Sequence, residues 1–295
     1  MEENLGALIR ELRISLRMSQ HALAEGICTQ AFISKVETGM VIPSLEIAFK
    51  IGQKLNIPLD YILEKLQYPS FDHYQELNYQ INRLLRERNY EEIYELVKAE
   101  KKNRQMARNI PFKQLLLWLD GICHYYILKD YEASIALFEQ ALDLTANPYT
   151  HSEREIEIIN SMGIIYCEHG NYDDALAMLM KATEYVNKRI VLKEKTLKIK
   201  VLYNTAKVLA KLERYEESNC LCDQAVQLCR DYEISYLLGE LYYQLGYNHE
   251  HLKEWSATLD YFDRSARIFE LQQNELFLEQ AVKRLKNIQS LNSGG

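Results

Sequence analysis

The stretch SQHALAEGICTQAFISKVETGMVIPSLEIAFKIGQKL, residues 19–55, decides the fold of the N-terminal part of the chain. Ser19 is of a type that caps helix N-termini and Gly26 of a type that ends helices, so the residues between them predict a short helix. Thr29 caps a second helix, which continues to the break at Gly39. Two short helices joined by a tight turn, with apolar-periodic segments on either side, predict a compact helical domain.

The same stretch resembles the helix-turn-helix family of phage repressors. The resemblance rests on three segments in order: S-Q-x-x-L-A at residues 19–24, I-S-K-V-E-T-G at 33–39 and P-S-L-E-I-A at 43–48, with Leu55 in the closing helix. In that family the second helix of the motif lies in the major groove of DNA, while the first crosses the phosphates. The resemblance therefore implies binding to double-stranded operator DNA.

The candidate DNA contacts surround the start of this second helix. The amide of Gln30 matches the donor and acceptor pattern of adenine, Lys35 reaches guanine or phosphate, and Ala31 suits a thymine methyl group. Gln20 opens the preceding helix and is expected to contact a phosphate. The predicted DNA-binding residues are Gln20, Thr29, Gln30, Ala31, Ser34 and Lys35. The alternative for any one of them is that it only solvates a helix face.

The charge of the chain limits how it can bind DNA. The net charge is −7, and residues 1–66 carry seven Lys and Arg against eight Asp and Glu, which argues against nonspecific attraction to nucleic acid. We therefore expect modest affinity per monomer, and binding as a homodimer to a palindromic site. The repressor resemblance assigns Arg13 and Glu37 to a structural ion pair between the first helix and the recognition helix.

An aromatic residue in a polar turn recurs along the rest of the chain. The five aromatics are Tyr90, Tyr131, Tyr172, Tyr215 and Trp255, and their separations are 41, 41, 43 and 40 residues. A period of this kind predicts stacked helix pairs. The residues around each aromatic resemble tetratricopeptide repeats, although the period is longer than the usual one of about 34 residues.

The composition favours helices throughout. Eleven glycines and five prolines in 295 residues are few for a turn-rich β fold. We predict an all-α protein with a five-helix helix-turn-helix domain at residues 1–66 and a linker at 67–73. Residues 74–290 are predicted to form a right-handed superhelix of about five degenerate tetratricopeptide-like helix pairs, which would hold the ligand site and the dimer contacts.

Polar side chains recur eleven or twelve residues before the repeat aromatics. A side-chain amide offers both donors and an acceptor, so it pairs with the N–H and C=O groups of an extended peptide of any sequence. A column of amides along the groove of a solenoid is therefore typical of peptide capture. The positions are Asn78, Asp120, Asn160, Asn204 and Gln244, of which four are amides. The alternative is that they are exposed helix residues in a polar chain.

The whole chain resembles Gram-positive transcription regulators that are controlled by reimported signalling peptides, of the PlcR type in the Rap/Rgg/NprR/PlcR/PrgX family. The resemblance rests on the order of the two domains, on R-x-R-N-Y-E-E-I-Y from Arg86 and on Y-N-x-A-K around Asn204. It implies that Asn160 and Asn204 grip the peptide backbone. It also implies that Arg86 and Arg88 lie near a peptide carboxylate and that Phe277 closes the pocket. A solvated charged turn is an equal alternative for the two arginines.

The sequence gives no support to an enzyme, a metalloprotein or a membrane protein. We find no G-x-S-x-G, no Gly-rich phosphate loop and no Cys/His nucleophile pattern, and we expect no cofactor. The spacing of His249 and His251 places their rings on different helix faces, so we expect no metal site. Apolar runs stay below the roughly 20 residues that span a bilayer, and the six cysteines are expected to be reduced thiols. We therefore expect a cytoplasmic protein without membrane contact.

These expectations combine into a quorum-sensing transcription regulator that binds operator DNA as a dimer and responds to a short intracellular signalling peptide. RNA polymerase is a further candidate partner. Two alternatives stay open. In one, the repeats dock a protein partner at the promoter instead of a peptide. In the other, the chain inhibits or dephosphorylates a signalling partner, as related repeat proteins without the DNA-binding part do.

Overall fold

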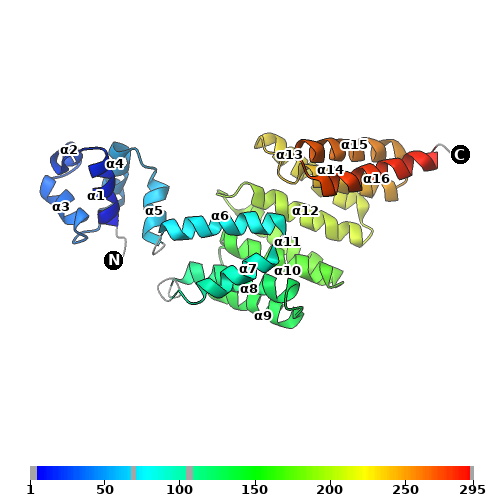
Figure 1. Ribbon diagram of the computed structural model, residues 1–295, viewed down its shortest axis with the longest axis horizontal. Helices are drawn as coiled ribbons and strands as arrows, with labels where there is room; N and C mark the ends of the chain where they lie inside the picture. Colours follow the sequence, from blue (N-terminus) through cyan, green and yellow to red (C-terminus); the bar gives the residue numbers. More distant parts are fainter. Residues whose placement is uncertain (1–4, 68–70, 104–108, 293–295) are drawn as a thin grey trace. The chain divides into compact units, whose positions relative to one another are not determined.

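The computed structural model describes residues 5–67, 71–103 and 109–292, and within these ranges it contains sixteen α-helices and no β-strand. The all-α prediction is confirmed. The chain divides into two compact units, Met1–Asp130 and Tyr131–Gly295. Figure 1 labels the helices of both units. Among the described residues, no helix is both long enough and apolar enough to cross a membrane.

The predicted boundary between the two domains, at the linker of residues 67–73, differs from the division into units at residue 130. Residues 68–70 of the predicted linker at 67–73 lie outside the described residues. The boundary between a DNA-binding domain and a repeat domain therefore stays a prediction, and so does the right-handed turn of the repeats.

Five short helices open the first unit, as predicted. Their bounds are α1 Leu5–Ser15, α2 Gln20–Ala24, α3 Gln30–Glu37, α4 Leu45–Leu55 and α5 Leu59–Gln67. The Ser19 hydroxyl accepts a hydrogen bond from the N–H of Ala22, and the Thr29 hydroxyl accepts one from the N–H of Phe32. Both side chains thus satisfy N–H groups that have no partner inside the helix. Gly26 adopts φ +76°, a left-handed conformation that favours glycine.

The core of these five helices is small and closely packed. The fully buried apolar residues at its centre are Ile9, Leu23, Ile33 and Ile51. Helices α1 and α3 approach each other so closely that a Cβ atom added to Gly6 would lie 1.9 Å from the carbonyl oxygen of Val36. Because a backbone carbonyl cannot turn aside as a side chain can, this crossing requires glycine at position 6.

The first unit continues with three longer helices, α6 Phe71–Glu87, α7 Tyr90–Glu100 and α8 Ile110–Tyr126. Helix α7 packs against both α6 and α8. Helix α8 is the most apolar of the three, and its Trp118 is only 4% exposed. The tyrosine that opens α7 stacks on the tyrosine that ends α8, with ring centroids 3.9 Å apart.

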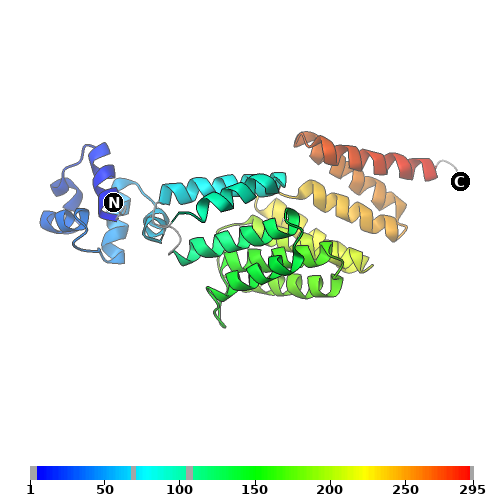
Figure 2. The same cartoon turned by 60° about the horizontal axis from the view of Figure 1, so that its bottom comes forward.

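The helices of the second unit are α9 Tyr131–Asp143, α10 Glu153–Glu168, α11 Tyr172–Lys188, α12 Thr196–Lys211, α13 Tyr215–Asp231, α14 Leu238–His251, α15 Trp255–Leu271 and α16 Glu275–Asn292. The unit contains three helical hairpins, α10–α11, α12–α13 and α14–α15, stacked side by side (Figure 2), with α9 packed on α10 and α16 packed on α15. Helices α10, α12 and α14 are the first helices of successive hairpins, and each packs on the next one of the three. They form a continuous layer.

Each predicted repeat aromatic is the first residue of a helix. The helices concerned are α7, α9, α11, α13 and α15, and of these α7, α11, α13 and α15 each pack on the helix before them in the chain. Two of these rings in the second unit stack on the histidine at the end of the next first helix: Tyr131 on His169 at 3.8 Å and Tyr215 on His251 at 4.9 Å between centroids. The repeated aromatic therefore joins one hairpin to the following one. The last of the series, Trp255, is 40% exposed.

Small residues let the two helices of a hairpin approach each other. A Cβ atom added to Gly163 of α10 would lie 2.5 Å from Cγ of Leu179 on α11. Gly246 of α14 lies in the same way against the ring of Phe262 on α15. Here the close neighbour is a side chain, in contrast to the backbone carbonyl at Gly6.

Candidate functional site

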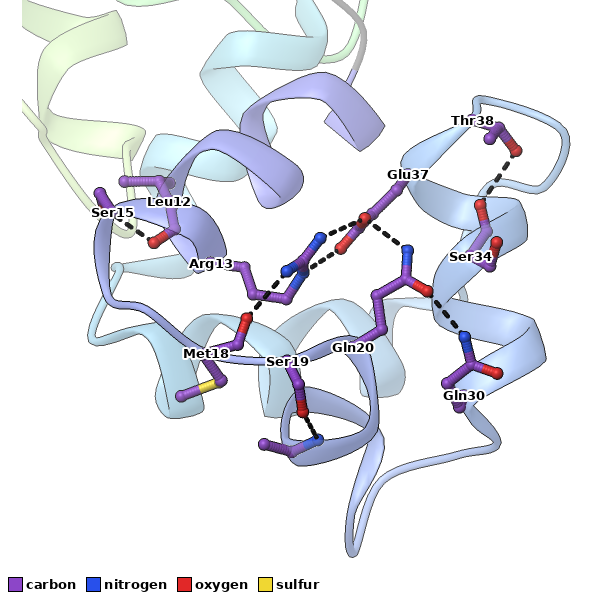
Figure 3. Close-up of polar contacts among 11 residues, drawn as sticks. Leu12, Arg13, Ser15, Met18, Ser19, Gln20, Gln30, Ser34, Glu37 and Thr38 are labelled. Atoms are coloured by element: carbon purple, nitrogen blue, oxygen red, sulfur yellow. Dashed lines mark hydrogen bonds and ion pairs between the residues drawn. The ribbon is translucent and has the colours of Figure 1, made fainter.

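A chain of hydrogen bonds connects α1, α2 and α3 and ends at Gln30, the exposed first residue of α3 (Figure 3). Arg13 Nε donates to Glu37 Oε1 at 2.6 Å, and Arg13 Nη2 donates to Glu37 Oε2 at 2.8 Å. Arg13 Nη1 donates to the carbonyl of Met18 at 2.8 Å. This two-pronged geometry is the strongest form of an arginine–carboxylate pair, and it fixes α1 on α3.

The Glu37 carboxylate is the centre of this network, because its side chain is only 2% exposed. Burial opposes its ionisation, but the hydrogen bonds from Arg13 and Gln20, with the charge of Arg13, outweigh burial and lower the pKa of Glu37. The carboxylate is therefore ionised and fully engaged at neutral pH.

Gln20 connects the buried pair to the surface. Its Nε2 donates to Glu37 Oε2 at 2.8 Å, and its Oε1 accepts from Gln30 Nε2 at 2.7 Å. The second bond fixes the orientation of the exposed Gln30 amide and leaves its Oε1 and one N–H without a partner among the described residues. These two groups are the pair that matches an adenine edge. The sequence suggested only a phosphate contact for Gln20. That both helices of the motif open with glutamine was the available signal for the link.

The other predicted DNA contacts share one surface of α3. Thr29, Ala31 and Lys35 are exposed, and Ser34 is half-buried between them. Thr38 also lies on the exposed end of α3, but its hydroxyl donates to the carbonyls of Ser34 and Lys35. The outward face of α3 thus carries an oriented amide, a small apolar group and an ammonium group.

The candidate peptide contacts in the first unit differ from one another. Arg86 and Arg88 are exposed, and Arg88 adopts φ +55° in the turn between α6 and α7. Asn78 is half-buried on α6. Asp120 is buried on α8, where one carboxylate oxygen accepts from Lys101 Nζ at 2.6 Å. Asp120 is therefore already paired with a cation of its own unit.

Two candidate peptide contacts of the second unit meet each other. Asn204 Nδ2 on α12 donates to Asn160 Oδ1 on α10 at 3.0 Å. Asn160 is 2% exposed, and Asn204 is half-buried. Among the described residues, the side-chain N–H groups of Asn160 and the side-chain oxygen of Asn204 have no hydrogen-bond partner. This amide pair therefore presents donors and an acceptor side by side, which is the complement of a peptide unit.

The remaining two candidates of the second unit contact their own neighbours. Gln244 Nε2 donates to Asn248 Oδ1 at 2.8 Å, and Asn248 in turn donates to Ser218 and Asn219. The amide of Gln244 therefore belongs to a buried network between α13 and α14. Phe277 on α16 is half-buried and stacks on Phe269, with centroids 5.3 Å apart.

A cavity of about 330 Å³ lies at the loops that precede α10 and follow α11. Its lining includes Tyr149, His151, Tyr185 and Ile190, and the rings of His151 and Tyr185 stack at 3.6 Å. The Asn160–Asn204 pair lies on helices outside this lining.

Comparisons with known proteins fit this geometry. Residues 9–62 match a family model described as helix-turn-helix, and residues 78–288 match the model of the RNPP family C-terminal domain. The comparison with curated proteins gave no match.

Solved structures of regulators are similar over the whole chain. The structure of Bacillus thuringiensis PlcR in complex with the peptide PapR7 and DNA is 28% identical, with a TM-score of 0.86, and the match covers 95% of this chain and 99% of that one. PlcR in its apo form is 25% identical, with a TM-score of 0.68 over 95% and 98% of the two chains.

A more distant structure shares the fold. The pheromone receptor Rgg2 of Streptococcus dysgalactiae is 18% identical, with a TM-score of 0.65 over 96% of this chain and 99% of that one. The model of the RNPP C-terminal domain alone spans well over half of the sequence, and the helix-turn-helix precedes it. The chain belongs to the RNPP family of transcription regulators.

Proposed function

We propose that this protein is a cytoplasmic quorum-sensing transcription regulator that binds palindromic operator DNA as a homodimer and is controlled by a short signalling peptide. The observation that carries the proposal is the joint occurrence, in one RNPP-family chain, of an oriented Gln30 on an exposed α3 and of the Asn160–Asn204 amide pair. The similar PlcR structure holds both a peptide and DNA.

DNA reading is assigned to the exposed face of α3. Gln30 is held by Gln20, so it meets a base edge in a fixed orientation and loses little side-chain entropy on binding. Lys35 supplies a cation on the same face. Because the domain is not basic overall, affinity depends on these few contacts and on pairing two copies.

Peptide binding is assigned to the layer formed by α10, α12 and α14. The amide pair there offers hydrogen bonds to a backbone and does not read side chains. The peptide controls DNA binding only if it binds the DNA-competent state more tightly than the other state, because only differential affinity shifts the equilibrium.

The DNA assignment is tested on an operator selected from random-sequence DNA by the full-length protein. We expect Gln30→Ala and Lys35→Ala each to weaken binding by roughly 1–3 kcal/mol. Gln53→Ala removes an exposed glutamine from α4 and serves as the matched control, with unchanged affinity. Unchanged footprints for the two α3 variants would refute the assignment.

The peptide assignment is tested by purifying the protein from its native host and identifying bound molecules by mass spectrometry. We expect a short peptide with the wild-type protein and its loss with Asn204→Ala. Asn187→Ala, at an exposed position of α11, is the control. Recovery of a folded protein partner without any peptide would favour the promoter-anchored scaffold instead.

A further inference from the structure

A charged cluster lies one helical turn from the amide pair. Arg154 Nη1 donates to Glu157 Oε2 at 2.8 Å, both on α10. Lys200 Nζ on α12 lies 3.6 Å from the other oxygen, Glu157 Oε1. This second distance is an ion pair but is too long for a hydrogen bond. Two cations therefore share one carboxylate, and the three side chains of Arg154, Lys200 and Glu157 together carry one positive charge.

Lys200 is the member of the cluster whose hydrogen-bonding capacity is least used. Its ammonium group carries three donors, and within the described ranges it makes no hydrogen bond. The side chain is 30% exposed. Burial opposes its charge, but Glu157, Tyr236 and Glu194 outweigh burial and raise the pKa of Lys200. The group is thus a charged, poorly satisfied cation at the edge of the layer.

The helix geometry places this cation beside the amide pair. Lys200 and Asn204 are four residues apart on α12, and so share one helix face, about 5.4 Å apart along the axis. Glu157 and Asn160 stand in the same relation on α10, at three residues. Consecutive residues of an extended peptide are roughly 3.3 Å apart, so a backbone held by Asn204 brings a group one or two residues away to Lys200.

We propose that Lys200 is an anion-binding residue of the peptide site and selects peptides that carry a carboxylate one or two residues from the backbone group held by Asn204. The inference rests on the proposed peptide control and specifies its ligand as an acidic peptide. A carboxylate satisfies the donors that Glu157 leaves unused, whereas a basic peptide finds Glu157 already engaged by Arg154. The carboxylate comes from an Asp or Glu side chain or from the peptide C-terminus.

The experiment uses full-length protein and a synthetic mixture of random heptapeptides, prepared once with free C-termini and once as C-terminal amides. Retained peptides are sequenced by mass spectrometry. A side-chain source gives enrichment of Asp and Glu at one position in both mixtures. A C-terminal source gives about tenfold better retention of the free acids than of the amides, as expected for a charge-assisted hydrogen bond.

Variants of Lys200 assign the preference to this residue. Lys200→Gln should still retain peptides but lose the preference for the carboxylate, and Lys200→Arg should keep it. Lys198→Gln, two residues away on α12, is the matched control and should behave as the wild type. For the best acidic peptide, replacing its carboxylate by an amide should weaken wild-type binding about tenfold and leave Lys200→Gln binding unchanged.

Different outcomes overturn different claims. Retention of peptides without any carboxylate preference, or a preference that survives in Lys200→Gln, overturns the role of Lys200 and leaves peptide control standing. The comparison of acid and amide peptides on the wild-type protein decides the first point even if Lys200→Gln does not fold. Retention of no peptide at all by the wild type overturns the proposed peptide control, and the role of Lys200 with it.

Discussion

The five helices of the helix-turn-helix part, α1–α5, and the second unit, α9–α16, use their buried polar groups differently. In the first, three helices meet at the single carboxylate of Glu37, which binds Arg13 and Gln20 at once. In the second, the buried polar contacts lie within one hairpin, as the Ser265–Gly239 bond does, or join neighbouring hairpins, as the Asn160–Asn204 bond joins α10 to α12.

The difference teaches where each region is sensitive to change. A region organised around one centre loses much of its stability and its DNA-reading surface when the centre is removed. A stack of repeats depends on interfaces between neighbours, so a substitution there acts mainly on adjacent hairpins. Four experiments test this contrast.

The largest effect is expected from Glu37→Ala. The change leaves the Arg13 guanidinium, whose side chain is 12% exposed, without its carboxylate. Breaking a buried pair from one side costs roughly 3–5 kcal/mol. Urea unfolding of the protein, followed by circular dichroism, measures the loss. Operator binding should fall as well, because Gln20 and Gln30 lose their support.

The control is Glu46→Ala, which removes an exposed carboxylate paired with Lys50 one turn away on α4. No measurable loss is expected there, since exposed pairs contribute little. An equal decrease in the free energy of unfolding for the two variants would show that Glu37 does not hold the three helices together.

A smaller effect is expected from adding a methyl group at the close helix crossings. Gly6→Ala meets a backbone carbonyl and should cost about 3 kcal/mol, the upper part of the range for overpacking. Gly163→Ala meets only the Leu179 side chain and should cost about 1 kcal/mol, because leucine can change rotamer. Thermal unfolding midpoints of the two variants give the order, and the reverse order would contradict the contrast.

Asn204→Ala tests the repeat contact itself. The change leaves the Asn160 side-chain oxygen, in a residue 2% exposed, without its donor, which should cost roughly 1–3 kcal/mol. Hydrogen exchange should rise mainly in α10 and α12. An even loss of protection against hydrogen exchange throughout α9–α16 would mean that the second unit, like the helix-turn-helix part, depends on a single polar contact. Asn187→Ala should leave exchange unchanged.

The smallest effect concerns helix caps. Ser19→Ala removes the hydroxyl that accepts from the N–H of Ala22 and should cost about 1 kcal/mol. In the described structure Asn171, at the equivalent position before α11, makes no such capping bond. Asn171→Ala should therefore cost less than Ser19→Ala in the same thermal unfolding measurement. Equal costs would show that the caps do not distinguish the regions.

The sequence predicted what depends on near neighbours. Ser19 and Thr29 were identified as caps because a cap bonds three residues along the chain. The regular period of the polar turns at Tyr131 and Tyr215 predicted stacked helix pairs, and each of these residues is the first of a helix. These signals were sufficient to predict the all-α class and the recurring helical hairpins.

The resemblance to phage repressors anticipated one distant contact, the Arg13–Glu37 ion pair, but the sequence did not predict which side chains meet in the repeats. Asn160 and Asn204 are 44 residues apart, and their bond depends on how α10 packs on α12. Gln244 has the same register in its repeat but bonds to Asn248, because Ser218 and Asn219 of α13 draw Asn248 into a buried network. Asn160, Asn204 and Gln244 share one position in their repeats, but the packing of the helices gives Gln244 a different kind of partner.

One of the five repeat aromatics, Trp255, is a tryptophan, and it gives the second unit an intrinsic fluorophore. The chain has two tryptophans, Trp118 in the first unit and Trp255 in the second, and they are 4% and 40% exposed. Because indole emission shifts to longer wavelengths in contact with water, the two residues emit in distinguishable ranges. Replacing either one by phenylalanine leaves a fluorescence signal that follows the other unit alone.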